Sequence, residues 1–93
     1  MKKIDNLEKV VRDFTRKNGR AWITYDEFTR EMKISRETNL DLHNVRGDIT
    51  YSITKNMFLN LARRIDKWQG VISMWKLYKD GYGIEITIMN EVS

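Results

Sequence analysis

Cysteine and proline are both absent from this chain of 93 residues, and histidine occurs only once. Without cysteine, neither disulfides nor thiolate metal sites can form, and a single histidine lacks a partner for a metal site or a catalytic dyad. The lack of proline, together with only five glycines, argues against a disordered linker. No apolar stretch approaches the ~20 residues needed to span a bilayer. The sequence therefore predicts one small cytoplasmic domain without a metal or cofactor and with no membrane partner.

Motifs that carry catalysis are also missing. The chain has no glycine-rich phosphate loop, no nucleophile elbow and no ligand set for zinc. Its carboxylates are scattered singly among basic residues, as surface ion pairing requires. We therefore predict that the protein is not an enzyme.

Positive charge is unevenly distributed along the chain, whose formal net charge is +4. The segment 53–79 contains six basic residues and one acidic residue, a balance of +5, whereas residues 80–93 balance at −3. A basic segment of this kind is typical of a surface that binds a phosphate backbone. The alternative is an ordinary solvated face.

Apolar residues at three- and four-residue spacing predict a first helix over about residues 5–18, ended by Gly19. Asp5 and Glu8 have the spacing of an N-terminal capping box. The helix should pack its apolar side against the core of the domain.

A second helix is predicted over about 25–34. Thr24 would cap it with Glu27 in the capping-box position, and Phe28 and Met32 would face the core four residues apart. This helix would follow a short apolar strand.

The next stretch allows two interpretations. Ser35 could cap a short helix over about 36–46 that ends at Gly47, and we favour this helix. Alternatively, the alternating run Leu40-Asp41-Leu42 and the segment 49–53 could be extended.

The clearest helix is predicted over about 55–69, with Thr54 as N-cap and Gly70 as the terminator. One face of this helix is apolar and the opposite face is polar and basic. The apolar residues are Phe58, Leu61, Ile65 and Trp68, and the polar ones are Asn56, Asn60, Arg63 and Lys67.

A β-hairpin is predicted over about 71–89, because Asp80-Gly81 is typical of a two-residue turn. This turn gives one apolar face and one opposite-charge pair across the strands. The predicted pairs are Leu77 with Ile84, Trp75 with Ile86, and Lys76 with Glu85.

This order of elements resembles the winged helix-turn-helix family. The turn at 23–28 and the step from helix through Gly70 to strand at 65–72 are similar to that family's. The resemblance implies an α+β fold, mainly α, with three to four helices and a C-terminal β-hairpin wing. It also implies a small transcriptional regulator, or a plasmid or phage accessory factor, that binds double-stranded DNA as a homodimer. One departure is the connection of about twenty residues before the helix capped by Thr54.

Within this interpretation, Asn56 and Asn60 are candidates for base contacts because asparagine can bond adenine in the major groove. Arg63, Arg64 and Lys67 would hold phosphates, and Lys76 and Lys79 would act from the wing. If the segment 36–46 is the reading helix instead, its DNA-binding residues would be Arg36, Asn39, His43 and Arg46.

A protein-binding module or small inhibitor is the alternative function. Ile72, Met74 and Met89 are predicted to form an apolar patch on the outer hairpin face, and such patches mark protein interfaces. The three tryptophans are expected in the core rather than as stacking platforms for single strands. They are Trp22, Trp68 and Trp75.

Overall fold

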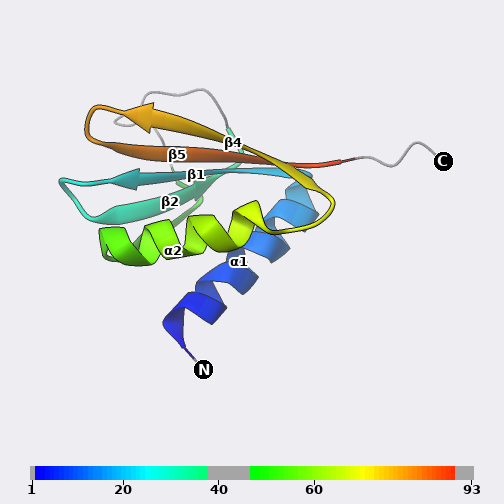
Figure 1. Ribbon diagram of the computed structural model, residues 1–93, viewed down its shortest axis with the longest axis horizontal. Helices are drawn as coiled ribbons and strands as arrows, with labels where there is room; N and C mark the ends of the chain where they lie inside the picture. Colours follow the sequence, from blue (N-terminus) through cyan, green and yellow to red (C-terminus); the bar gives the residue numbers. More distant parts are fainter. Residues whose placement is uncertain (1, 38–46, 90–93) are drawn as a thin grey trace.

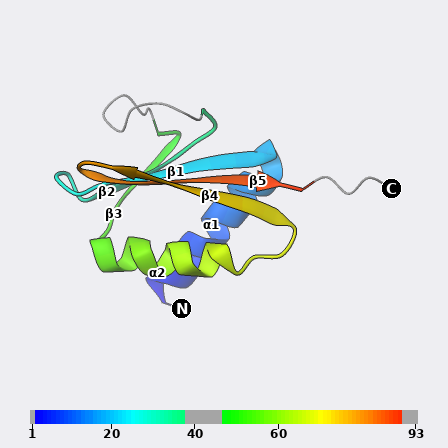
Figure 2. The same ribbon diagram turned by 45° about the horizontal axis from the view of Figure 1, so that its top comes forward.

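The computed structural model describes residues 2–37 and 47–89 of the chain. In this part, five antiparallel strands form one sheet in the order β3-β2-β1-β5-β4. Both helices lie on the same side of the sheet, as Figure 1 and Figure 2 show. The elements are α1 (Lys3–Asn18), β1 (Arg20–Asp26), β2 (Glu31–Ser35), β3 (Ile49–Ser52), α2 (Lys55–Asp66), β4 (Val71–Tyr78) and β5 (Gly81–Ile88).

Strand β1 lies at the centre of the sheet, and its side chains are buried on both faces. Ala21, Ile23 and Tyr25 belong to the core between sheet and helices and are at most 1% exposed. Trp22 and Thr24 alternate with them on the opposite face and are 2% exposed. This two-sided burial explains why β1 contains a nearly continuous apolar run.

The helix predicted over 25–34 is wrong, because this segment is a β-hairpin formed by β1 and β2. The Asp26 carboxylate accepts hydrogen bonds from the backbone N–H groups of Phe28 and Thr29, at 2.8 and 3.3 Å. Arg30 has a left-handed backbone (φ 58°), which completes the turn. The predicted core residue Phe28 is 76% exposed. Met32 is buried as predicted, but it projects from a strand.

Helix α1 confirms the first predicted helix. It ends at Gly19, whose left-handed backbone (φ 79°) lets its N–H bond the carbonyl of Thr15. The proposed capping box is wrong, because the helix begins two residues earlier and Lys2 occupies the N-cap without a side-chain cap. The carboxylates of Asp5 and Glu8 instead point to α2.

Helix α2 confirms the start and the buried face of its prediction, but it ends three residues before the predicted end at 69, and Lys67 rather than Gly70 follows its last residue. The Thr54 hydroxyl accepts a hydrogen bond from the N–H of Met57 at 3.2 Å, and the helix ends at Asp66. Phe58, Leu61 and Ile65 are at most 1% exposed. The Phe58 ring stacks between Tyr25 and Tyr82, with ring centroids 5.1 and 6.1 Å away.

The C-terminal hairpin exists as predicted, but its register is shifted by two residues. The turn residues are Lys79 and Asp80, so Trp75 pairs with Ile84 and Leu77 with Tyr82. Lys76 lies opposite Gly83, and Glu85 lies opposite Met74. A shift of two leaves every side chain on its predicted face.

Two contacts account for the observed register. The N–H of Glu27 donates to the Asp80 carbonyl at 2.9 Å and ties the two hairpin turns together. A Cβ at Gly83 would lie 3.0 Å from the Tyr78 ring and 3.1 Å from the Trp22 ring. A side chain at position 83 would press on both rings and require them to shift by a few tenths of an ångström, which the turn signal alone could not show.

The winged-helix expectation and the mainly α class are wrong. The described residues are 41% strand and 35% helix, in an α+β fold with two helices and a five-stranded sheet. A β-hairpin replaces the second helix that a helix-turn-helix requires. Residues 49–52 form strand β3, which confirms the extended alternative for this segment. Most of the helix predicted over 36–46 lies outside the described residues.

Candidate functional site

Strand β4 is an edge of the sheet, and it is apolar on both faces. The exposed fractions are 52% for Ile72, 63% for Met74, 40% for Trp75 and 75% for Leu77. Met89, just beyond β5, is 48% exposed. An edge strand of eight residues with one lysine and no proline lacks the usual protection against pairing with another chain.

The free backbone groups of β4 can be assigned from its pairing with β5. The N–H of Met89 donates to the Gly70 carbonyl at 3.0 Å, so this opposed pair is hydrogen-bonded. Because bonded and non-bonded pairs alternate in an antiparallel ladder, Ile72, Met74 and Lys76 direct their backbone groups to β5. The intervening residues direct theirs to the open edge. They are Val71, Ser73, Trp75 and Leu77.

Asp66, the last residue of α2, holds two side chains of this edge in place. Its carboxylate accepts a hydrogen bond from the Ser73 hydroxyl at 2.9 Å. It also accepts the indole N–H of Trp75, which lies 3.2 Å from both oxygens. The large Trp75 ring is thereby oriented while it remains accessible.

The polar residues predicted on the outer face of α2 do lie together there. Asn56, Asn60, Arg63 and Lys67 are all exposed. The Arg63 guanidinium donates to the Asn60 side-chain oxygen at 3.0 Å. These four residues, the α2 polar row, form one surface on the side of α2 opposite to its buried residues, with Lys67 directly after the helix.

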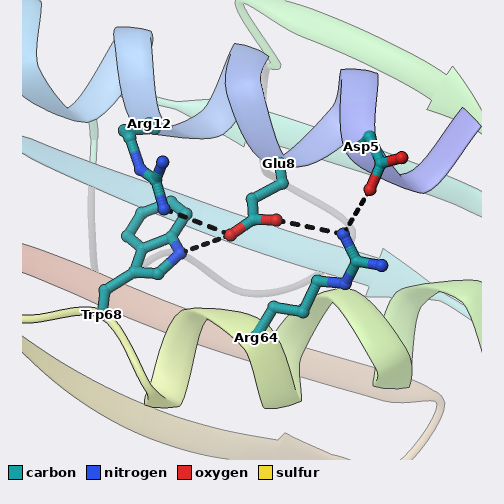
Figure 3. Close-up of polar contacts among 5 residues, drawn as sticks. All are labelled: Asp5, Glu8, Arg12, Arg64 and Trp68. Carbon is teal, nitrogen blue, oxygen red and sulfur yellow. Dashed lines mark hydrogen bonds and ion pairs between the residues drawn. The ribbon is translucent and has the colours of Figure 1, made fainter. Parts of the chain in front are cut away.

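Arg64 is engaged differently, within a cluster that joins the two helices. Its guanidinium bonds Asp5 at 2.7 Å and Glu8 at 3.1 Å, as Figure 3 shows. Glu8 also accepts the indole N–H of Trp68 at 2.8 Å and pairs with Arg12 at 3.2 Å. The Arg12 guanidinium lies over the Trp68 ring, 4.8 Å from its centroid. We call these five residues the interhelix cluster; its Arg64 already has two anionic partners within the chain.

The remaining candidates are dispersed. Lys76 lies on the face of β4 opposite to Asp66 and α2, with its ammonium 5.3 Å from the Tyr78 ring centroid. Lys79 is exposed in the hairpin turn. Arg36 pairs with Asp48 at 3.3 Å. Asn39, His43 and Arg46 lie outside the described residues.

The interhelix cluster lowers the pKa of both its carboxyl groups. The hydrogen bond from Arg64 is the main cause for Asp5. For Glu8, partial burial acts to raise the pKa, but the bonds from Trp68 and Arg64 outweigh it. Groups with lowered folded-state pKa values stabilise the fold above their unfolded pKa, and this contribution is lost as pH falls through the folded value.

We therefore expect the free energy of unfolding to fall on acidification below about pH 4, the ordinary carboxylate range. Glu8→Gln should weaken this dependence, because the group can no longer gain a proton. Urea titrations across this pH range measure the effect. Asp13→Asn, at an exposed position of the same helix, is the control and should retain the wild-type dependence. Equal pH dependence in wild type and Glu8→Gln would contradict the assigned role of Glu8.

Other kinds of site find no support in the described residues. Within 2–37 and 47–89, no group of three or more His, Cys, Asp or Glu side chains is placed to hold a metal ion. Neither described helix has the length and apolar character needed to cross a membrane.

Comparisons with known protein families, with curated proteins and with solved structures found no match to this chain. The candidate site therefore stands on its own geometry.

Sequence reasoning found part of this site and missed Trp75 and Leu77. Ile72, Met74 and Met89 were predicted to form an exposed patch, and all three are exposed. The prediction that Trp75 lies in the core is wrong, and Leu77, on the same predicted apolar face, is also exposed. A usable signal was present: the run from Val71 to Tyr78 is apolar at both odd and even positions, although a sheet with helices on one side needs only one apolar face.

Proposed function

We propose that this protein is a protein-binding module that takes up an extended polypeptide segment along the open edge of β4. The observation that carries this proposal is an edge strand whose outward backbone groups have no partner strand in the described part of the chain and whose exposed apolar side chains lie on both faces. In strand addition, main-chain hydrogen bonds supply affinity and alternate side chains supply specificity.

The two faces of β4 would make different contacts with the added strand. Trp75 and Leu77 lie on the side of the helices, where Asp66 orients the Trp75 indole. Ile72 and Met74 lie on the other side. An aromatic anchor held in place before binding loses less conformational entropy on association, which increases affinity.

Leu77→Pro tests whether the backbone takes part. Leu77 directs its N–H to the open edge, so proline there removes a donor for the partner without removing a bond to β5. Short peptides selected from a random displayed library against the wild type serve as probes. We expect Leu77→Pro to weaken their binding by about tenfold or more relative to Leu77→Ala, which retains the N–H.

Circular dichroism and thermal melting of both variants provide the folding control. Equal affinities of folded Leu77→Pro and Leu77→Ala for the selected peptides would contradict strand addition. So would peptides whose binding is unaffected by either change.

A second candidate function is binding of double-stranded DNA, as a small regulator would require. The observation that favours it is the α2 polar row, in which two amides and two cations are exposed side by side. Asparagine suits base edges, whereas lysine and arginine suit phosphates and guanine. Arg64 is not needed for this proposal because its partners lie in α1.

The triple variant Asn60→Ala/Arg63→Ala/Lys67→Ala tests this second candidate. Lys9→Ala/Lys17→Ala also removes two positive charges, but from exposed positions of α1, and is the matched control. If α2 contacts DNA, the triple variant should lose about tenfold or more in duplex affinity, and the slope of log affinity against log salt should fall by about two. Equal losses in both variants would indicate attraction by net charge alone and contradict a DNA surface on α2.

A further inference from the structure

We propose that the strand bound by β4 is β4 of a second copy of this chain, which gives a homodimer with one continuous sheet. This inference rests on the proposed function, because it names the partner for the same edge. The two strands would run antiparallel about a two-fold axis at Met74, as closed dimers with an isologous interface require.

Hydrogen-bond parity restricts the possible registers. Only Val71, Ser73, Trp75 and Leu77 direct backbone groups outward. A two-fold pairing must therefore place these residues opposite one another. Centring the pairing at Met74 uses all four, with Val71 opposite Leu77 of the second copy and Ser73 opposite Trp75. Centring it at Trp75 leaves Val71 without a partner, so the Met74 register makes the most hydrogen bonds.

The side chains of β4 are self-complementary in this register. On the side of the helices, each large Trp75 meets the small Ser73 of the second copy, and both are already held by Asp66 of their own chain. On the other side, Met74 meets Met74 and Ile72 meets Lys76. The exposed Met74 of one copy thus lies against Met74 of the other, and the exposed Leu77 lies against Val71.

Charge also permits this pairing. Lys76 is the only charged residue of β4, although the chain as a whole carries +4. In the Met74 register the two Lys76 positions are four residues apart, about 13 Å along the strands. This exceeds the Debye length of about 8 Å at physiological ionic strength, so their repulsion is largely screened.

The absence of cysteine from the sequence allows a direct test of the register. Met74→Cys would place two thiols opposite each other in a non-hydrogen-bonded pair, where Cα atoms are about 4.5 Å apart. This lies within the range of about 4.4–6.8 Å that a disulfide bridges. Oxidised glutathione would accept the two electrons and release two reduced glutathiones as the intermolecular disulfide forms.

Ile72→Cys and Lys76→Cys are matched controls on the same face. In the proposed register their thiols lie about 13 Å from their counterparts, beyond the reach of a disulfide. We expect most of the Met74→Cys chain, and little of either control, to run as a cross-linked dimer on a non-reducing gel. Similar cross-linking of all three variants, or cross-linking of a control alone, would overturn the register.

The mass of the wild-type protein tests the dimer itself, without a substitution. Light scattering during size exclusion should give twice the 11.2 kDa chain mass at high concentration and return toward 11.2 kDa on dilution. A mass of one chain at all concentrations would overturn the second copy as partner. If the protein were a monomer but selected peptides still bound it and lost affinity for Leu77→Pro, strand addition itself would stand. A monomer whose peptide binding is not weakened by Leu77→Pro would overturn both proposals.

Discussion

Phe58→Ala is expected to lower the free energy of unfolding by about 3–5 kcal/mol, the usual range for a fully buried aromatic residue. Phe58 is 1% exposed, and its ring lies between those of Tyr25 and Tyr82. Its loss would leave a cavity where α2 meets the sheet. Because the free energy of unfolding of native proteins is about 5–15 kcal/mol, this change removes a large fraction of the total stability.

Phe28→Ala is the matched control for this prediction. Phe28 is 76% exposed in the turn between β1 and β2, so its replacement should change stability by no more than about 0.5 kcal/mol. Urea unfolding of the two variants measures both values. The pair also distinguishes the hairpin from a helix over 25–34, since Phe28 would face the core of such a helix. A cost for Phe28→Ala as large as that for Phe58→Ala would contradict the hairpin.

Trp22→Ala is expected to have a comparable effect, about 3–5 kcal/mol, through the other face of the sheet. Trp22 is 2% exposed, and its ring lies against Gly83 beside Tyr78. Its buried indole N–H has no hydrogen-bond partner among residues 2–37 and 47–89. Removing this orphan group offsets part of the packing loss, so the cost should fall toward the lower end of the range.

Trp75→Ala supplies the comparison, because Trp75 is 40% exposed at the edge of the same sheet. Chemical denaturation at high dilution should show a markedly smaller loss for Trp75→Ala than for Trp22→Ala. An equal or larger loss for Trp75→Ala would mean that this residue is a core element. It would then not be an accessible anchor.

Local signals predicted both helices of the structure. Gly19 and Thr54 act at the ends of α1 and α2 as their chemistry requires, and the apolar spacing of α2 identified Phe58 and Leu61 as buried residues. The faces of the C-terminal hairpin also followed from alternation. These features depend on contacts between residues that are close in the sequence, so they can be inferred from the sequence of one chain.

The β1–β2 hairpin could not be separated from a helix in the same way. Thr24, Glu27, Phe28 and Met32 have helical spacing, but Ala21, Ile23 and Tyr25 also alternate as a strand would. The choice is made by tertiary pairing, since β1 receives β2 on one side and β5 on the other. That pairing supplies burial on both faces, and it outweighs local helix signals.

The candidate site also combines features with local sequence signals and features that depend on tertiary contacts. The α2 polar row followed from helical spacing, and its four residues are exposed. The ion pairs of Arg64 with Asp5 and Glu8 join residues 59 and 56 positions apart and had no local signal. The open edge depends on strand order, because β4 becomes an edge only when β5 pairs with β1. A pairing of this kind cannot be derived from the apolar pattern of β4.

Amide hydrogen exchange along β4 tests the central claim most directly. In the dilute protein, the outward amides of Ser73, Trp75 and Leu77 should exchange rapidly, whereas those of Met74 and Lys76 should be protected by β5. At high protein concentration, or with a selected peptide bound, the outward amides should become protected as well. Outward amides that exchange equally fast in all these conditions would contradict strand addition at β4.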